Sequence, residues 1–224
     1  MSMQSGVVLS MMDQLSQKQF NACALVESYW DNLCREGALP LRSAIDPRGI
    51  EDALNYAFIL ESIGTGIARI RIAGMHLNEL MGMEVRGMPI SSFVTPASRA
   101  AFARVLVSAL KSPAKMQLSL TAEEAPRTGG KPLTARMLLL PMADDEGRLN
   151  RILGCLETKG QFGQKPHRFE LTSVKKTSLT SQPQRASSPE VKHPEQQGFR
   201  DAPVPFEARK TRAPHLKLVR NGDG

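Results

Sequence analysis

The ionisable side chains that could do acid-base or nucleophilic chemistry are scattered along this sequence. No pattern of a nucleophile with its base stands out among them. The acidic runs Glu123-Glu124 and Asp144-Asp145-Glu146 fall in predicted turns, where solvated carboxylates are the expectation. The sequence therefore predicts no catalytic residues and a chain that is not an enzyme. The four histidines are His76, His167, His193 and His215.

The three cysteines, Cys23, Cys34 and Cys155, lack the spacing of a metal site. Their odd number, in a chain without export features, favours reduced thiols in a cytosolic protein and argues against a structural zinc. The N-terminal residues have neither a basic leading region nor an apolar run long enough for a signal peptide or a membrane span. We expect a soluble cytoplasmic protein with no metal and no membrane contact.

The net charge of +7 is concentrated in the last third of the chain. Residues 1–159 hold 17 Lys and Arg against 16 Asp and Glu, whereas residues 160–224 hold 12 against 6. Residues 178–205 contain almost no large aliphatic side chain, so they cannot bury enough surface to offset the entropy of ordering. We expect a flexible N-terminus at 1–20, a domain at 21–159 and a disordered basic tail at 160–224.

The basic tail has two interpretations, electrostatic contact with nucleic acid or plain solubility. Aromatic side chains that could stack on bases are few and far apart in the tail, which disfavours nucleic acid. Its residues 209–220, RKTRAPHLKLVR, contain a short alternating run that could add to a sheet edge on binding.

An amphipathic helix is predicted from about Asn21 to Arg35, with Gly37 just beyond its end. Two arrangements are open: the helix packs on its own domain, or it also pairs with the helix of a partner chain. The apolar stripe, which is the candidate dimerisation surface, consists of Leu25, Val26, Tyr29, Trp30 and Leu33.

Short strands and short helices follow. In the second strand, Arg69 and Arg71 are expected to point outward and Ile70 and Ile72 inward, by simple alternation. Thr95 is expected to cap a helix with Pro96 at its first position. The predicted elements are a three-turn helix from Asp46-Pro47, strands Phe58–Ile63 and Ile67–Ile72, a helical turn Met75–Met81 closed by Gly82, and a helix from Thr95-Pro96 that Pro113 ends.

Three further strands, Lys115–Ala122, Leu133–Met142 and Leu149–Thr158, complete an antiparallel sheet. The last two are apolar on both faces, so the sheet needs a second cover. The helix that contains Trp30 can supply this cover, donated by the same chain or by a neighbour. Exchange of the helix between two copies predicts a homodimer.

The segment of residues 58–94 resembles the PAS (per-arnt-sim) domain. The likeness lies in two strands joined at Gly64-Thr65-Gly66, short helices, a pair of glycines at Gly82 and Gly87, and the Thr95-Pro96 helix. The lead-in around Trp30 and the phrase at residues 71–74 are similar to small single-domain PAS-like proteins of alphaproteobacteria. The resemblance implies an α+β fold: a five-stranded antiparallel sheet with helices on one face and the N-terminal helix on the other.

The resemblance also implies a sensory role and a pocket on the inner face of the sheet. Binding of haem would require a neutral His76 that faces a large cavity, and the cysteine motif of flavin-binding light sensors has no counterpart between Met75 and Val94. No cofactor is therefore predicted. The candidate pocket residues are Phe58, Leu60, Ile70, Ile72, His76, Leu80, Met137 and Leu139.

The function expected from the sequence is that of a non-enzymatic regulatory module. It would act through a signalling partner protein, with or without a small apolar ligand, and with a homodimer as its own assembly. The alternatives are a regulator that contacts nucleic acid through its tail and a haem or redox sensor.

Overall fold

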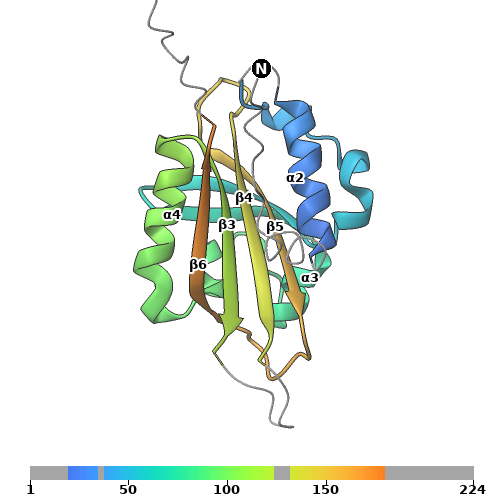
Figure 1. The fold of residues 1–224 in the computed structure, drawn as a ribbon, viewed down its shortest axis with the longest axis vertical. Coiled ribbons are helices and arrows are strands. Elements are labelled where there is room, and N and C mark those ends of the chain that lie inside the picture. The colour runs from blue at the N-terminus through green and yellow to red at the C-terminus, as the bar shows by residue number, and fades with distance from the viewer. Residues whose placement is uncertain (1–19, 35–37, 124–131, 180–224) are drawn as a thin grey trace, which may run out of the picture. The chain divides into compact units, whose positions relative to one another are not determined.

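Six antiparallel strands form one sheet, and helices lie against both of its faces (Figure 1). The computed structural model describes residues 20–34, 38–123 and 132–179. The strands follow the order β2-β1-β5-β4-β3-β6 across the sheet. They are β1 (Ala57–Gly64), β2 (Ile67–Ala73), β3 (Ala114–Ala122), β4 (Thr134–Met142), β5 (Arg151–Lys159) and β6 (Phe169–Ser178).

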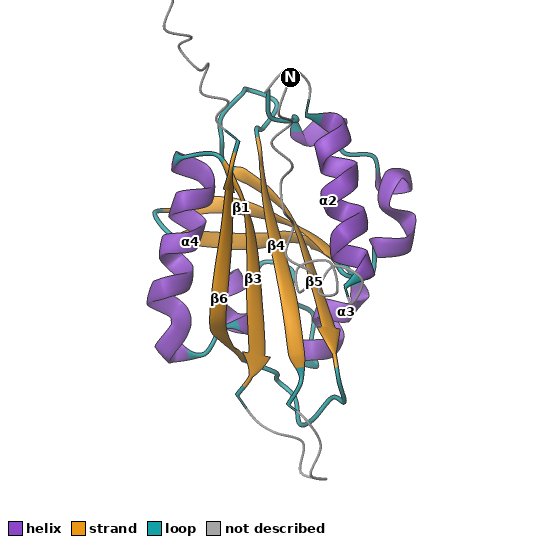
Figure 2. Cartoon of the chain, in the orientation of Figure 1, coloured by secondary structure: helices purple, strands orange, loops and turns teal. Residues whose placement is uncertain are grey.

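The helices of the described residues divide between the two faces, and Figure 2 shows α2 and α4 flanking the long strands. The α-helices are α2 (Asn21–Leu33), α3 (Met75–Met81) and α4 (Arg99–Lys111). Short 3-10 helices connect them: η1 (Arg42–Ala44), η2 (Pro47–Ala53), η3 (Ile90–Phe93) and η4 (Pro96–Ser98). The predicted α+β class, with the N-terminal helix apart from the others, is confirmed.

Alternation along β4 separates two apolar cores. Met137 and Leu139 face α3 and α4 and belong to the inner core, which also contains Phe58 and Phe102. Leu138 and Leu140 face the other way and belong to the outer core. Because successive side chains of a strand point to opposite faces, an apolar run is the expected pattern of a strand covered on both sides.

The sheet has six strands where the sequence predicted five. Strand β6 pairs with β3 along its whole length and lies in the part that was assigned to the disordered tail at 160–224. Only Phe169, at the start of β6, is buried, and most of the strand is polar and exposed. A strand of this composition lacks the apolar alternation by which strands are recognised in a sequence.

A β-bulge corrects the prediction for Ile72. Ile59 pairs with Ile72 and Leu60 pairs with Ile70, so Arg71 is an extra residue on β2. The extra residue reverses the alternation, and Ile72 lies on the outer face with half of its side chain exposed.

Two helix predictions also require correction. The expected three-turn helix after Asp46 is the 3-10 helix η2, interrupted at Ile50 by a φ of −133°, although Asp46 does cap it by accepting a hydrogen bond from the Arg48 N–H. Thr95 precedes η4 and then α4, but its hydroxyl makes no capping bond. Helix α3 and its closure by Gly82, whose φ is +72°, are confirmed.

The expectations for residues 1–19, for residues 180–224 and for the motif at 209–220 lie outside the described residues. The interpretation of the tail as a nucleic-acid contact therefore stays a prediction. Within the part of the chain that the structure describes, each helix is too short or too polar to cross a membrane.

The burial of Trp30 predicts a large loss of stability on truncation. Trp30→Ala is expected to lower the free energy of unfolding by about 3–5 kcal/mol, because a fully buried aromatic group is replaced by a cavity. Asn32→Ala, at an exposed position on the same helix, is the matched control and should change stability by about 0.5 kcal/mol or less. Urea unfolding followed by circular dichroism measures both, and equal effects of the two variants would contradict the burial of this face.

Candidate functional site

Helix α2 covers the outer face of the sheet. Its buried side chains Val26 and Trp30 pack in one cluster with Leu138 on β4 and Leu153 on β5. The prediction that the Trp30 helix covers the second apolar face of these strands is confirmed, and the cover comes from the same chain. We define the α2 cover as helix α2 together with the outer-core residues beneath it, which are Leu138, Leu140, Leu153 and Cys155.

The N-terminus of α2 is capped by a residue far away in the sequence. Phe20, at the cap position, offers no side-chain hydrogen bond. Instead, Glu157 Oε2 on β5 accepts hydrogen bonds from the Ala22 N–H at 2.9 Å and the Cys23 N–H at 3.2 Å. Lys159 Nζ lies 3.0 Å from the other carboxylate oxygen. A negative charge at a helix N-terminus satisfies unpaired N–H groups and interacts favourably with the helix dipole.

A second polar attachment lies along the side of α2. Lys115 Nζ on β3 is 2.9 Å from Glu27 Oε1 and 2.9 Å from Asp31 Oδ2. Burial by itself would lower the pKa of Lys115, but the hydrogen bonds that its ammonium donates to these two carboxylates outweigh burial and raise the pKa above its ordinary value. Lys115 therefore stays charged and joins the middle of α2 to the sheet.

Two aromatic side chains fix the C-terminal half of α2. The Trp30 Nε1–H donates to the Pro141 carbonyl on β4 at 3.2 Å. The Tyr29 hydroxyl accepts from the Asp46 N–H, just before η2, at 2.7 Å. Helix α2 is thus joined to β3, β4, β5 and the segment that leads into η2, all within one chain.

The candidate dimerisation residues divide between buried and exposed positions. Val26 and Trp30 are fully buried under α2, whereas Leu25 is 46% exposed and Tyr29 and Leu33 are half-buried. Most of the stripe is therefore already in contact with its own domain, and only Leu25 presents a large apolar group to solvent.

The candidate pocket residues are mostly members of the packed inner core. The exceptions are Ile72, which lies on the outer face because of the bulge, and His76. Phe58 also borders an outer apolar cavity of about 220 Å³ formed by β1, β2 and η2. The core members are Phe58, Leu60, Ile70, Leu80, Met137 and Leu139.

His76 on α3 is buried among protein groups. Its Nε2 lies 3.0 Å from Thr158 Oγ1 and its Nδ1 lies 3.8 Å from Glu79 Oε2, while the Tyr56 ring packs at a centroid distance of 4.8 Å. Burial lowers the pKa of His76 below its ordinary value, against the opposing effects of Glu79 and Glu157. Both ring nitrogens are engaged by protein groups, which does not favour a haem ligand.

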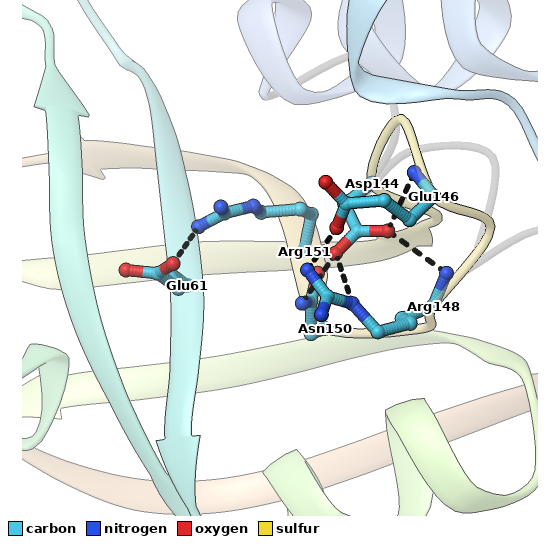
Figure 3. Close-up of polar contacts among 6 residues, drawn as sticks. All are labelled: Glu61, Asp144, Glu146, Arg148, Asn150 and Arg151. Atoms are coloured by element: carbon cyan, nitrogen blue, oxygen red, sulfur yellow. Dashed lines mark hydrogen bonds and ion pairs between the residues drawn. The ribbon is translucent and has the colours of Figure 1, made fainter. Parts of the chain in front are cut away.

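A polar network holds the turn between β4 and β5 (Figure 3). Asp144 accepts hydrogen bonds from the Arg148 N–H at 2.9 Å, the Arg148 Nε–H at 2.8 Å and the Asn150 amide at 2.7 Å. Nearby, the ion pair of Glu61 with Arg151, at 2.6 Å, joins β1 to β5. The residue before Asp144, Ala143, is bonded to the chain that leads into η1, so the turn positions this segment as well.

The Asp144 carboxyl in this turn is expected to make a pH-dependent contribution to stability. Desolvation would raise the pKa of Asp144, but the bonds from Arg148 and Asn150 outweigh it and lower the pKa from 3.8 to about 2. A carboxyl whose pKa is depressed in the fold stabilises it above its unfolded pKa, and this stability is lost as the pH falls through the folded value.

Asp144→Asn is therefore expected to destabilise the protein at neutral pH, with the difference from wild type shrinking between about pH 4 and pH 2. Urea unfolding across that range measures it, with Asp145→Asn as the exposed neighbouring control. A difference that stayed constant with pH would show that the charge of Asp144 is not responsible.

The cap on α2 makes a separate prediction. Glu157→Gln keeps the shape of the side chain but replaces the charged carboxylate, which accepts both hydrogen bonds, by a neutral amide. We therefore expect a loss of about 1–3 kcal/mol in the free energy of unfolding. Trp30 is the single tryptophan, and its fluorescence reports directly on the α2 cover during urea unfolding. Glu170→Gln, at an exposed position on β6, is the control. If both variants unfolded like wild type, the capping role of Glu157 would be refuted.

Solved structures similar to this chain are PAS and light-oxygen-voltage domains. A PAS domain of a protein from Colwellia psychrerythraea is 13% identical, with a TM-score of 0.37, and the match covers 49% of this chain and 92% of that one. The blue-light photoreceptor Aureochrome1 LOV, in its light state, is 14% identical with a TM-score of 0.37, covering 51% and 88%. An RNA-binding Light-Oxygen-Voltage receptor is 15% identical with a TM-score of 0.34, covering 56% and 37%.

Curated proteins give no match to this sequence. A family model described as a PAS domain, however, matches residues 18–157, which is more than half of the chain. The match includes α2 as well as the sheet from β1 to β5. The chain therefore belongs to the PAS-domain family of sensory and regulatory modules.

Proposed function

We propose that this chain is a non-catalytic, cytoplasmic regulatory module whose output is the state of the α2 cover. The observation that carries the proposal is the attachment of α2 by separable polar bonds, at Glu157, Lys115 and Trp30, over a core distinct from the inner one. In this proposal α2 occupies two positions relative to the sheet while the inner core stays intact. A ligand or partner that binds one position better shifts the population toward it.

The partner in this proposal is a protein, and one form of it is a second copy of this chain. Exchange of α2 between two copies replaces each intrachain contact by an identical contact to the neighbour, so its cost is low. The proposal places the exchanged helices close to the two-fold axis. Leu25, whose side chain is 46% exposed in the single chain, would then be covered.

Sedimentation velocity at micromolar concentration tests the exchange. The wild-type protein is expected to be a dimer, and Leu25→Glu should shift it toward a folded monomer because a charge would lie at the new contact. Met83→Glu, at another exposed apolar position, is the control and should leave the dimer unchanged. A wild-type monomer would rule out the homodimer and leave a different protein as the partner.

A further inference from the structure

An apolar cavity of about 220 Å³ opens on the outer face of the sheet, beside the α2 cover. One wall is the segment through η1 and η2, and the floor consists of β1, β2 and β5. The sequence predicted a pocket in the inner core, whereas this cavity lies on the opposite face of the sheet. The aliphatic side chains that line the cavity are Ile45, Ile50, Leu54, Ile59, Ile72 and Leu153.

Two large aliphatic groups at the cavity remain exposed to solvent. The bulge at Arg71 brings Ile72 to this face, where it is 50% exposed, and Leu54, at the end of η2, is 38% exposed. Exposed aliphatic side chains beside an apolar cavity mark a place where an apolar body can be buried without displacing protein. A comparable cavity of about 150 Å³, lined by Leu, Ile and Phe, binds benzene, so this one can take a group of at least that size.

Arg42 is the one charged residue among those that line the cavity. Its backbone is fixed, because the Arg42 N–H donates to the Ala143 carbonyl at 2.8 Å and the Ala143 N–H donates to the Pro40 carbonyl at 3.1 Å. Its side chain is half-buried, and within the described residues no carboxylate lies at ion-pair distance from it. A guanidinium offers a fork of N–H donors that matches a carboxylate with two parallel hydrogen bonds.

We propose that this cavity binds a small monocarboxylate with an apolar body. The aromatic or aliphatic body lies against Ile59, Ile72 and Leu54, and the carboxylate pairs with Arg42 at the edge. The site is built from two parts that the sequence keeps apart, the segment before β1 and the bulged strand β2.

The cavity is continuous with the α2 cover. Ile50, Ile59 and Leu153 line it and also belong to the apolar cluster that contains Val26 and Trp30. A ligand in the cavity therefore packs against the same side chains on which α2 rests. This coupling, unlike the binding itself, rests on the proposed role of α2 as the output.

NMR titration of the full chain with 3-phenylpropanoate tests the binding. Amide shifts are expected at Ile50, Ile59 and Ile72, with saturation in the millimolar range or below. The neutral 3-phenylpropanamide and the cationic 3-phenylpropylamine, which share the same ring and chain, should bind at least about tenfold more weakly, because they lack the charge-assisted bonds to Arg42.

Arg42→Gln should lower the affinity for the carboxylate about tenfold and leave that for the amide unchanged. Arg48→Gln, an exposed arginine that does not line the cavity, is the matched control. The proposal is overturned if millimolar carboxylate shifts none of the three isoleucines, if acid and amide bind equally, or if Arg42→Gln has no effect.

A separate readout tests the coupling to α2. Saturating 3-phenylpropanoate is expected to change the Trp30 fluorescence or its quenching by acrylamide, since the cavity and Trp30 share one cluster. Binding without any change at Trp30 would retain the ligand site and contradict the role of α2 as its output. A change at Trp30 that persisted in Arg42→Gln without binding would contradict the site.

Discussion

Strands β4 and β5 are apolar on both faces, and this constraint governs the arrangement of the domain. Helices α3 and α4 cover one face, so a second cover is required, and α2 supplies it from the N-terminal side of the chain. The contact between Glu157 and the first turn of α2 satisfies the hydrogen-bonding groups of both partners. The buried carboxylate of Glu157 needs hydrogen-bond donors, and the first turn of α2 has N–H groups without partners. Each satisfies the other, which fixes where α2 begins on the sheet.

The division into two cores has a functional consequence for a PAS-family module. The inner core joins the sheet to α3 and α4, whereas the outer core involves α2, η2 and the far side of the same strands. Strands β1, β4 and β5 contribute alternate residues to both cores, so a change in the twist or position of these strands alters the packing on both faces. The outer cavity lies where the outer core is incompletely filled, beside the element that we propose as the output.

The parts of the fold that the sequence could predict depend on local periodicity. The uninterrupted apolar run that includes Met137 and Leu138 indicated a strand buried on both faces. The apolar stripe through Trp30 indicated the helix that covers its second face. The features that were missed depend on contacts between distant residues. Glu157 caps a helix 135 residues away, and Arg71 forms a bulge that only pairing with β1 reveals. Strand β6 pairs with the edge of the sheet that β3 would otherwise leave free. The polar sequence of β6 does not by itself indicate a strand.

Native-state hydrogen exchange most directly tests the claim that α2 is a separable cover. The amides of Val26 and Trp30 on α2 should exchange through an opening of lower free energy than those of Leu138 and Leu153 beneath them, because α2 can leave while the inner core stays folded. Exchange of helix and strands at one common free energy, equal to that of global unfolding, would contradict the account, since α2 would then be an inseparable part of a single core.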